Sequence, residues 1–265
     1  MRARRPQYGK PRAAGVVLLG LWLAACGNSD IGGMSAVGTG NVSTTSDNGG
    51  GTDDGFKNLF ASSGAQPIVG RQVIANPTLA DVMQPASNLA EITVGRPNAP
   101  VTIIKYASMT CPYCAKFQRD VFPELKRQYI DTGKVRLVVR EFPIGFQSGA
   151  ATIALRCAAP DKQLALYEKL MAQQSSWVSQ EVRTDPIFKV AAQVGVTRAQ
   201  YDACREDKAL VGELNKVKER GRALGIIGTP NFFINGRLVK TELSLPGLKA
   251  IIDPLIASAP TPQKA

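Results

Sequence analysis

A buried strand that leads directly into a pair of cysteines is the feature that most constrains how this chain folds. Residues 101–107, Val-Thr-Ile-Ile-Lys-Tyr-Ala, are rich in β-branched side chains and predict a strand inside a sheet. Residues 111–114, Cys-Pro-Tyr-Cys, follow closely and open a segment, 111–132, whose apolar residues recur at helical spacing. Pro112 fits the first turn of a helix, where no backbone N–H is needed. The two cysteines are therefore expected where a strand meets a helix N-terminus.

This junction gives Cys111 and Cys114 different chemical characters. Two cysteines three positions apart on a first helical turn can form a disulfide without large strain. The unpaired N–H groups and partial positive charge of the helix N-terminus favour the thiolate of Cys111. A cysteine with a pKa of ~8.5 is only slightly ionised at neutral pH, whereas one lowered to ~5 is almost fully ionised. Cys111 is expected to be the exposed, attacked sulfur, and Cys114 the deeper one that resolves a mixed disulfide.

Metal binding and a passive structural disulfide are the alternative interpretations of these cysteines. A structural zinc site needs four ligands, and the chain has no histidine and no second Cys-x-x-Cys motif. No metal is expected, and no cofactor besides the redox-active disulfide of Cys111 and Cys114. The residues alone leave a passive disulfide open.

The N-terminus predicts an export signal over residues 1–25. Five basic residues precede a short apolar run, 13–25, which ends in Ala24 and Ala25 and is too short to span a membrane comfortably. A buried N-terminal helix is the alternative. Loss of the signal removes five of 32 basic residues and none of 21 acidic ones, so the net charge falls from +11 to +6. No nucleic-acid partner is expected for an exported protein, so this charge is interpreted as solvated surface that aids contact with an anionic membrane.

Residues 23–26, Leu-Ala-Ala-Cys, resemble the lipobox of bacterial lipoproteins. That resemblance implies that Cys26 becomes the lipidated first residue and anchors the chain to a membrane. An ordinary signal peptide followed by a chance cysteine is the alternative. Residues 26–66 are predicted to be a flexible tether, because Gly, Ser, Thr, Asn and Asp dominate and apolar side chains are sparse. Whether residues 65–89 form an ordered lead-in or continue the tether is left open.

The folded domain is predicted over residues 67–258, with a short tail at 259–265. Residues 91–94 and 134–142 read as strands. The second of them should pair in parallel with the strand that precedes the cysteines, as in a βαβ unit. Pro123 is expected to kink the intervening helix.

An inserted, mostly helical region is predicted at about residues 147–207. Within it, Asp185 is interpreted as an N-cap followed by proline at the first helical position, and Thr197 begins a capping box. Residues 231–239 predict two strands joined by an Asn-Gly turn, and residues 244–258 predict a final helix.

Five cysteines are an odd number in an exported protein and need an explanation. If Cys26 is lipidated and Cys111 pairs with Cys114, then Cys157 and Cys204 remain as a second pair. A structural disulfide between these two would staple the helical insertion. Two separate buried thiols are the alternative.

Four features together resemble the thioredoxin superfamily, in particular its DsbA-like branch of periplasmic oxidoreductases. They are the strand that enters residues 108–114, the strand that ends in Arg-Glu-Phe-Pro at 140–143, the helical insertion, and residues 228–236, Gly-Thr-Pro-Asn-Phe-Phe-Ile-Asn-Gly. The resemblance covers about residues 89–258 and implies an α/β thioredoxin fold with an inserted helical subdomain. It also implies a cis bond between Thr229 and Pro230 that faces the cysteines, in a loop whose backbone pairs with an extended substrate. The residues alone leave open that Pro230 simply begins a strand.

Two residues depart from the pattern of the most oxidising members. Tyr113 stands where those members have histidine, so no imidazolium supports the Cys111 thiolate, and a weaker oxidant is expected. Many relatives place a buried acid on the strand six residues before the first cysteine, and here that residue is Lys105. Either its amine lies under Cys114, or the side chain snorkels to the surface, which is the slightly favoured interpretation.

The leading hypothesis is a monomeric periplasmic enzyme that introduces disulfide bonds into unfolded exported proteins. The resemblance implies a membrane partner like DsbB that reoxidises the cysteines. A reductase or isomerase kept reduced by another partner is the alternative among enzymes, although isomerases of the family generally carry an N-terminal dimerisation domain that the tether looks unable to form. The third hypothesis is a lipid-tethered chaperone or binding module whose cysteines are merely structural.

Overall fold

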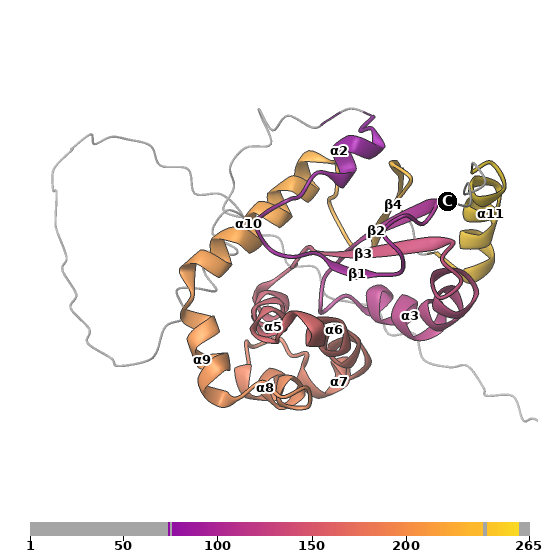
Figure 1. Cartoon of the computed structure of the whole chain (residues 1–265). Coiled ribbons are helices and arrows are strands. Elements are labelled where there is room, and N and C mark those ends of the chain that lie inside the picture. Colours follow the sequence, from indigo (N-terminus) through magenta and orange to yellow (C-terminus); the bar gives the residue numbers. More distant parts are fainter. Residues whose placement is uncertain (1–73, 75, 241–242, 260–265) are drawn as a thin grey trace, which may run out of the picture. The chain divides into compact units, whose positions relative to one another are not determined.

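Figure 1 shows a computed structural model of the chain, which describes residues 74, 76–240 and 243–259. The predicted signal peptide, Cys26, the tether and all of the predicted tail beyond residue 259 lie outside the described residues. In the part that the structure describes, no helix is both long and apolar enough to cross a membrane.

A mixed sheet forms the centre of the described domain, in the order β1-β3-β2-β4-β5. Strands β2 and β3 are parallel, which confirms the predicted βαβ unit, and the other neighbours in the sheet are antiparallel. The central strand β2 therefore has hydrogen-bonded neighbours on both sides. The strands are β1 (Ile92–Val94), β2 (Val101–Ala107), β3 (Val135–Glu141), β4 (Asn231–Ile234) and β5 (Arg237–Val239).

Helices cover both faces of this sheet, because alternate residues of β2 point to opposite sides. Ile103 and Ala107 join the larger core with α3, α5, α6 and α11, whereas Ile104 and Tyr106 join a smaller core with α2 and the end of α10. In Figure 1, α2 and α10 lie above the sheet, and α3, α5 and α6 lie below it. The helices are α2 (Leu79–Met83), α3 (Pro112–Asp120), α4 (Phe122–Leu125), α5 (Phe146–Cys157), α6 (Gln163–Ala172), α7 (Gln174–Trp177), α8 (Thr184–Ala192), α9 (Arg198–Glu206), α10 (Lys208–Ala223) and α11 (Leu245–Ala257).

The helix after the cysteines is interrupted, as Pro123 predicts. Helix α3 ends at Asp120, Val121 separates it from α4, and a π-helical turn, Lys126–Ile130, completes the segment. Pro123 has no N–H to donate to the carbonyl four residues earlier, so a continuous α-helix is broken there.

Helices α5 to α9 form the insertion between β3 and β4, close to the predicted limits. The Thr197 capping box is present, with its hydroxyl accepting the N–H of Gln200. The predicted cap at Asp185 is wrong, because α8 begins at Thr184 with Arg183 at the cap position. Pro186 still lies in the first turn, where its missing N–H would have no partner within the helix in any case.

The C-terminal elements match the prediction. Asn235 and Gly236 form the turn between β4 and β5, both with positive φ (45° and 86°), a conformation that a tight hairpin turn requires. Ser244 caps α11 by accepting the N–H of Gly247.

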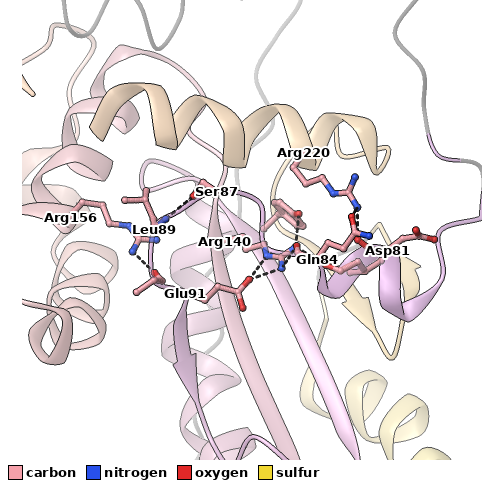
Figure 2. A network of polar contacts seen from close by, with 11 residues as sticks. Asp81, Gln84, Ser87, Leu89, Glu91, Arg140, Arg156 and Arg220 are labelled. Atoms are coloured by element: carbon pink, nitrogen blue, oxygen red, sulfur yellow. Dashed lines mark hydrogen bonds and ion pairs between the residues drawn. The ribbon is translucent and has the colours of Figure 1, made fainter. Parts of the chain in front are cut away.

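Residues 76–91, most of which lie in the stretch 65–89 that the sequence left open, are ordered, and Val82 packs against one face of the sheet in the smaller core. We call this segment the N-terminal strap. Thr78 and Asp81 form a capping box at its short helix α2, a signal visible in the sequence. Figure 2 shows the strap held by arginines from three other elements, Arg140 of β3, Arg156 of α5 and Arg220 of α10.

Arg140 makes the most extensive of these contacts. It is 2% exposed, pairs with Glu91 at 2.5 Å and donates to the carbonyl oxygens of Val82 (2.7 Å) and Gln84 (3.2 Å) (Figure 2). These partners satisfy a guanidinium that burial would otherwise strongly destabilise. The strap is therefore an integral part of the domain.

Candidate active site

Cys111 is the N-cap of α3, directly after β2. Its Sγ accepts the backbone N–H of Cys114 at 3.3 Å, and its own N–H donates to the Ser108 carbonyl at 3.1 Å. Pro112 occupies the first helical position, as expected. The strand, the turn and the helix cap together hold the Cys111 sulfur against the positive end of a helix.

The thiol of Cys111 is half-buried and acidic. Its hydrogen bond with the Cys114 side chain lowers its pKa to about 6, helped by the Thr229 side chain and the Cys114 N–H and opposed by burial. At neutral pH this sulfur is mostly thiolate.

Cys114 has the opposite character. Its side chain is fully buried, and burial raises the pKa of this thiol above its ordinary value, as does the hydrogen bond with Cys111. The positive charge of Lys105 acts in the other direction. The pair therefore combines a reactive outer thiolate with a protonated inner thiol.

The loop before β4 faces the outer sulfur. The bond between Thr229 and Pro230 is cis, and the Thr229 carbonyl oxygen lies 3.3 Å from Cys111 Sγ, which donates to it when protonated. The geometry that the resemblance implied is thus present, and two segments more than a hundred residues apart in sequence meet at Cys111.

An open groove of about 450 Å³ runs beside this loop. Tyr113 and Ile227 lie on it with 55% and 88% of their surfaces exposed, and Lys240 is at its border. Large exposed apolar side chains next to a reactive sulfur provide a surface for another apolar chain. The groove is lined by Tyr113, Ile227, Gly228, Thr229, Pro230, Asn231 and Lys240.

Lys105 does not snorkel to the surface, so the favoured sequence interpretation is wrong. Its side chain is 0% exposed, and its Nζ lies 4.4 Å from the centre of the Phe117 ring and 5.5 Å from that of Tyr167. The reason is that β2 is a central strand and its face is covered by α3 and α6, so no path leads the amine to water. Burial lowers the pKa of Lys105 to about 8, against the attraction of the Cys114 and Cys111 sulfurs.

The helical insertion supplies supporting residues that sequence reasoning missed. Gln174 Nε2 donates to the carbonyls of Met109 (2.7 Å) and Cys111 (3.1 Å), and Ser148 Oγ accepts the Met109 N–H at 3.0 Å. These contacts fix the turn that carries Cys111. No local sequence signal marks them, because they come from helices far along the chain.

Cys157 and Cys204 are brought together across α5 and α9. Cys157 Sγ donates to the Ile153 carbonyl oxygen at 3.2 Å, and burial raises the pKa of the Cys157 thiol, as does the neighbouring Cys204 side chain. Like Cys111 and Cys114, both are free thiols in the structure. The disulfide between them stays a prediction. Among the described residues, no three His, Cys, Asp or Glu side chains are grouped so as to hold a metal ion.

Comparisons with known proteins agree on the type of fold. The family model described as thioredoxin matches residues 87–254. A protein of Rickettsia bellii, provisionally named a protein-disulfide oxidoreductase, is 33% identical over 172 residues, which cover 63% of this chain and 64% of that protein. A Bacillus anthracis protein, provisionally named disulfide bond formation protein D, is 27% identical over 61% of this chain and 76% of its own length.

A solved structure gives the same result. The crystal structure of Wolbachia pipientis alpha-DsbA1 aligns with a TM-score of 0.62 and 27% identity, over 68% of this chain and 96% of that one. The match to the Rickettsia protein spans less than two thirds of that relative's length.

Proposed function

The chain belongs to the thioredoxin family, and from that premise we propose that it is a thiol–disulfide oxidoreductase that introduces disulfide bonds into exported proteins. The observation that carries the proposal is the contrast between Cys111, half-buried with a pKa of about 6, and the fully buried Cys114, whose pKa is raised. A passive disulfide does not need one reactive sulfur and one protected sulfur.

The chemistry begins with the oxidised Cys111–Cys114 pair. A substrate thiolate attacks Cys111 Sγ, the disulfide breaks, and Cys114 takes the bonding electrons. A second substrate thiolate then attacks the substrate sulfur of the mixed disulfide, and Cys111 leaves as a thiolate. Leaving groups of low pKa leave faster, so the acidity of Cys111 favours formation of the substrate disulfide and the reduced enzyme.

The substrate surface in this proposal is the groove beside Thr229 and Pro230. An extended, unfolded chain presents both a free backbone and apolar side chains, which suit the loop and the exposed rim at Tyr113 and Ile227. Unfolded exported proteins are therefore the proposed substrates.

The proposed location is the periplasm. There the chain would act as a monomer that a lipid on Cys26 holds at the membrane. A membrane protein resembling DsbB would reoxidise the cysteines. The basis for the location and the anchor is the predicted signal and lipobox, and the basis for the reoxidising partner is the DsbA-like resemblance.

Two measurements test the proposal. In an insulin-reduction assay, the Cys111→Ser variant should lose activity, whereas full activity in that variant would exclude the mechanism and favour a binding or chaperone module. Thiol trapping in cells should find Cys111 and Cys114 mostly oxidised. Mostly reduced cysteines would instead assign the protein as a reductase or isomerase.

A further inference from the structure

A short loop with few contacts lies beside the outer sulfur. Residues 227–229, which we call the Thr229 loop, connect Ile226 of the smaller core with the segment that begins β4. Ile227 is 88% exposed, and a Cβ added at Gly228 would meet no atom within 4 Å beyond its chain neighbours. Packing therefore does little to fix this loop, although its Thr229 carbonyl faces Cys111.

The hydrogen bonds to the Thr229 loop depend on the redox state of Cys111. In the thiol form, Cys111 Sγ donates to the Thr229 carbonyl oxygen at 3.3 Å. In a disulfide the same sulfur carries no proton, so this bond cannot form. A second bond, from Asn231 Nδ2 to the Gly228 carbonyl oxygen at 2.5 Å, involves neither cysteine. Within the described ranges, it is the one hydrogen bond accepted by the loop that would remain in the oxidised protein.

Asn231 is firmly held, yet part of its side chain has no partner. It is 6% exposed, begins β4 and pairs with Tyr106 of the central strand β2. Its Oδ1 is buried and makes no hydrogen bond to any of the described residues. A buried polar atom without a partner costs stability, and an apolar side chain at this position would avoid that cost. Packing alone therefore does not account for asparagine here, and what it adds is the N–H donor that reaches Gly228.

The hydrogen bond from Asn231 spans the residue that faces the sulfur. It joins the side chain of residue 231 to the carbonyl of residue 228, so it restrains the peptide groups on both sides of Thr229. We propose that Asn231 is a positioning residue for substrate binding, which holds the Thr229 backbone in place while Cys111 is oxidised and ready to meet a substrate. This inference rests on the proposed function.

A restrained loop favours the binding of an extended chain. Once Cys111 has no proton to donate, the Thr229 carbonyl is free to accept an N–H from the backbone of a substrate. A loop that is ordered beforehand binds without first losing conformational freedom, whereas a mobile loop that contains glycine loses much of it. A small dithiol offers no backbone to the loop and needs only access to Cys111. Asn231 should therefore matter more for peptides than for small dithiols.

The test compares two reduced substrates of the oxidised protein, an unfolded peptide with two cysteines and dithiothreitol. Quenching with acid, followed by alkylation, gives the second-order rate constant for the oxidation of each. For Asn231→Ala and Asn231→Leu, we expect the ratio of the peptide rate constant to the dithiothreitol rate constant to fall ~5- to 10-fold. That size corresponds to the loss of roughly one hydrogen bond from a loop that is then less ordered.

Asn235→Gly is the matched control at the other end of β4. The Asn235 side chain accepts the N–H of Thr102 and donates to the carbonyl of Pro100, so its loss loosens the same strand. Glycine tolerates the positive φ of 45° at this position. This variant should lose stability without a fall in the ratio. Circular dichroism and thermal melting check that each variant is folded.

The inference is overturned if folded Asn231→Ala and Asn231→Leu keep the wild-type ratio of rate constants. An equal fall in Asn235→Gly would also overturn it, since general loosening of β4 would then be the cause. Failure of the proposed function looks different, because a protein that is not an oxidoreductase oxidises neither substrate faster than its Cys111→Ser variant does.

Discussion

At the scale of single residues, two cysteines three positions apart differ because their surroundings differ. Cys111 lies at a helix cap and receives hydrogen bonds that favour its thiolate, whereas Cys114 is enclosed by apolar groups that favour its thiol. The sequence predicted this order of reactivity, since only the helix cap is exposed to a substrate. The sequence did not predict that the Lys105 side chain is buried, because the alternation of side chains along β2 does not reveal which helices cover that face of the sheet.

The low pKa of Cys111 has a consequence for stability. In the reduced protein the folded pKa is about 6, below the ordinary value of 9.0. The unfolded chain therefore binds more protons between these values, and stability rises with pH through this window. The stabilising contribution is full above the ordinary value and is lost as the pH falls through about 6.

We therefore expect the free energy of unfolding of reduced protein to increase from pH 6 to pH 8. The chain has no histidine, so the main side-chain titration usual in that window is missing. Urea unfolding at several pH values measures the effect. The Cys111→Ser variant is the control and should show a much smaller rise, which comes from the lowered pKa values of Lys105 and Lys218; an equal rise in both proteins would mean that Cys111 is not the responsible group.

At the scale of elements, the N-terminal strap shows how a segment with weak sequence signals becomes ordered. Its short helix has a capping box, but five residues of helix are too few to be stable alone. Burial of Val82 in the smaller core and the contacts of Arg140, Arg156 and Arg220 hold it in place. The sequence showed the cap and could not show the arginines that approach from β3, α5 and α10.

Removal of Arg140 should strongly destabilise the domain. Arg140→Ala leaves Glu91 and two carbonyl oxygens without their partner, and loss of one member of a buried pair costs about 3–5 kcal/mol. Arg119→Ala is the matched control, because Arg119 pairs with Asp120 on the surface and its loss should cost less than about 1 kcal/mol. Chemical denaturation measures the free energy of unfolding of both variants. Similar losses in the two would show that the contacts of Arg140 with the strap contribute little to stability.

At the scale of the whole molecule, the insertion is joined to the sheet domain next to the cysteines. Gln174 and Ser148 reach from it to the turn that carries Cys111, and Tyr167 covers Lys105. Helices α5 and α9 also bring Cys157 and Cys204 close enough for Cys204 to raise the pKa of Cys157, a pairing that the sequence anticipated only by counting cysteines. Both cysteines are free thiols in the structure, and the bridge between them stays a prediction.

If the bridge forms, it should stabilise the insertion. A disulfide that closes a loop of roughly 50 residues contributes about 4 kcal/mol in the chain-entropy model, and measured values are often lower. In air-oxidised protein, Cys157 and Cys204 should resist alkylation after unfolding, as read by mass spectrometry. The Cys157→Ala/Cys204→Ala double variant should unfold more readily than the wild type, and the difference should disappear under strong reductant. Complete alkylation of both cysteines in the oxidised protein would exclude the bridge.

The sequence by itself determined the features that depend on neighbours along the chain. These are the strand before the cysteines, the cap at Cys111, the break at Pro123, the Asn235-Gly236 turn and the parallel βαβ pair. Backbone dihedral preferences, caps and hydrophobic periodicity act over a few residues, so a pattern can reveal them.

Only the tertiary structure decided what each side chain meets from distant parts of the chain. It buried Lys105 between α3 and α6, set the Thr229 carbonyl against Cys111, and enclosed Arg140 under the strap. Desolvation and charge pairing depend on what packs against a group, and they control its pKa. The cysteine motif could therefore be recognised in the sequence, whereas the pKa values of its two thiols depend on packing that only the tertiary structure shows.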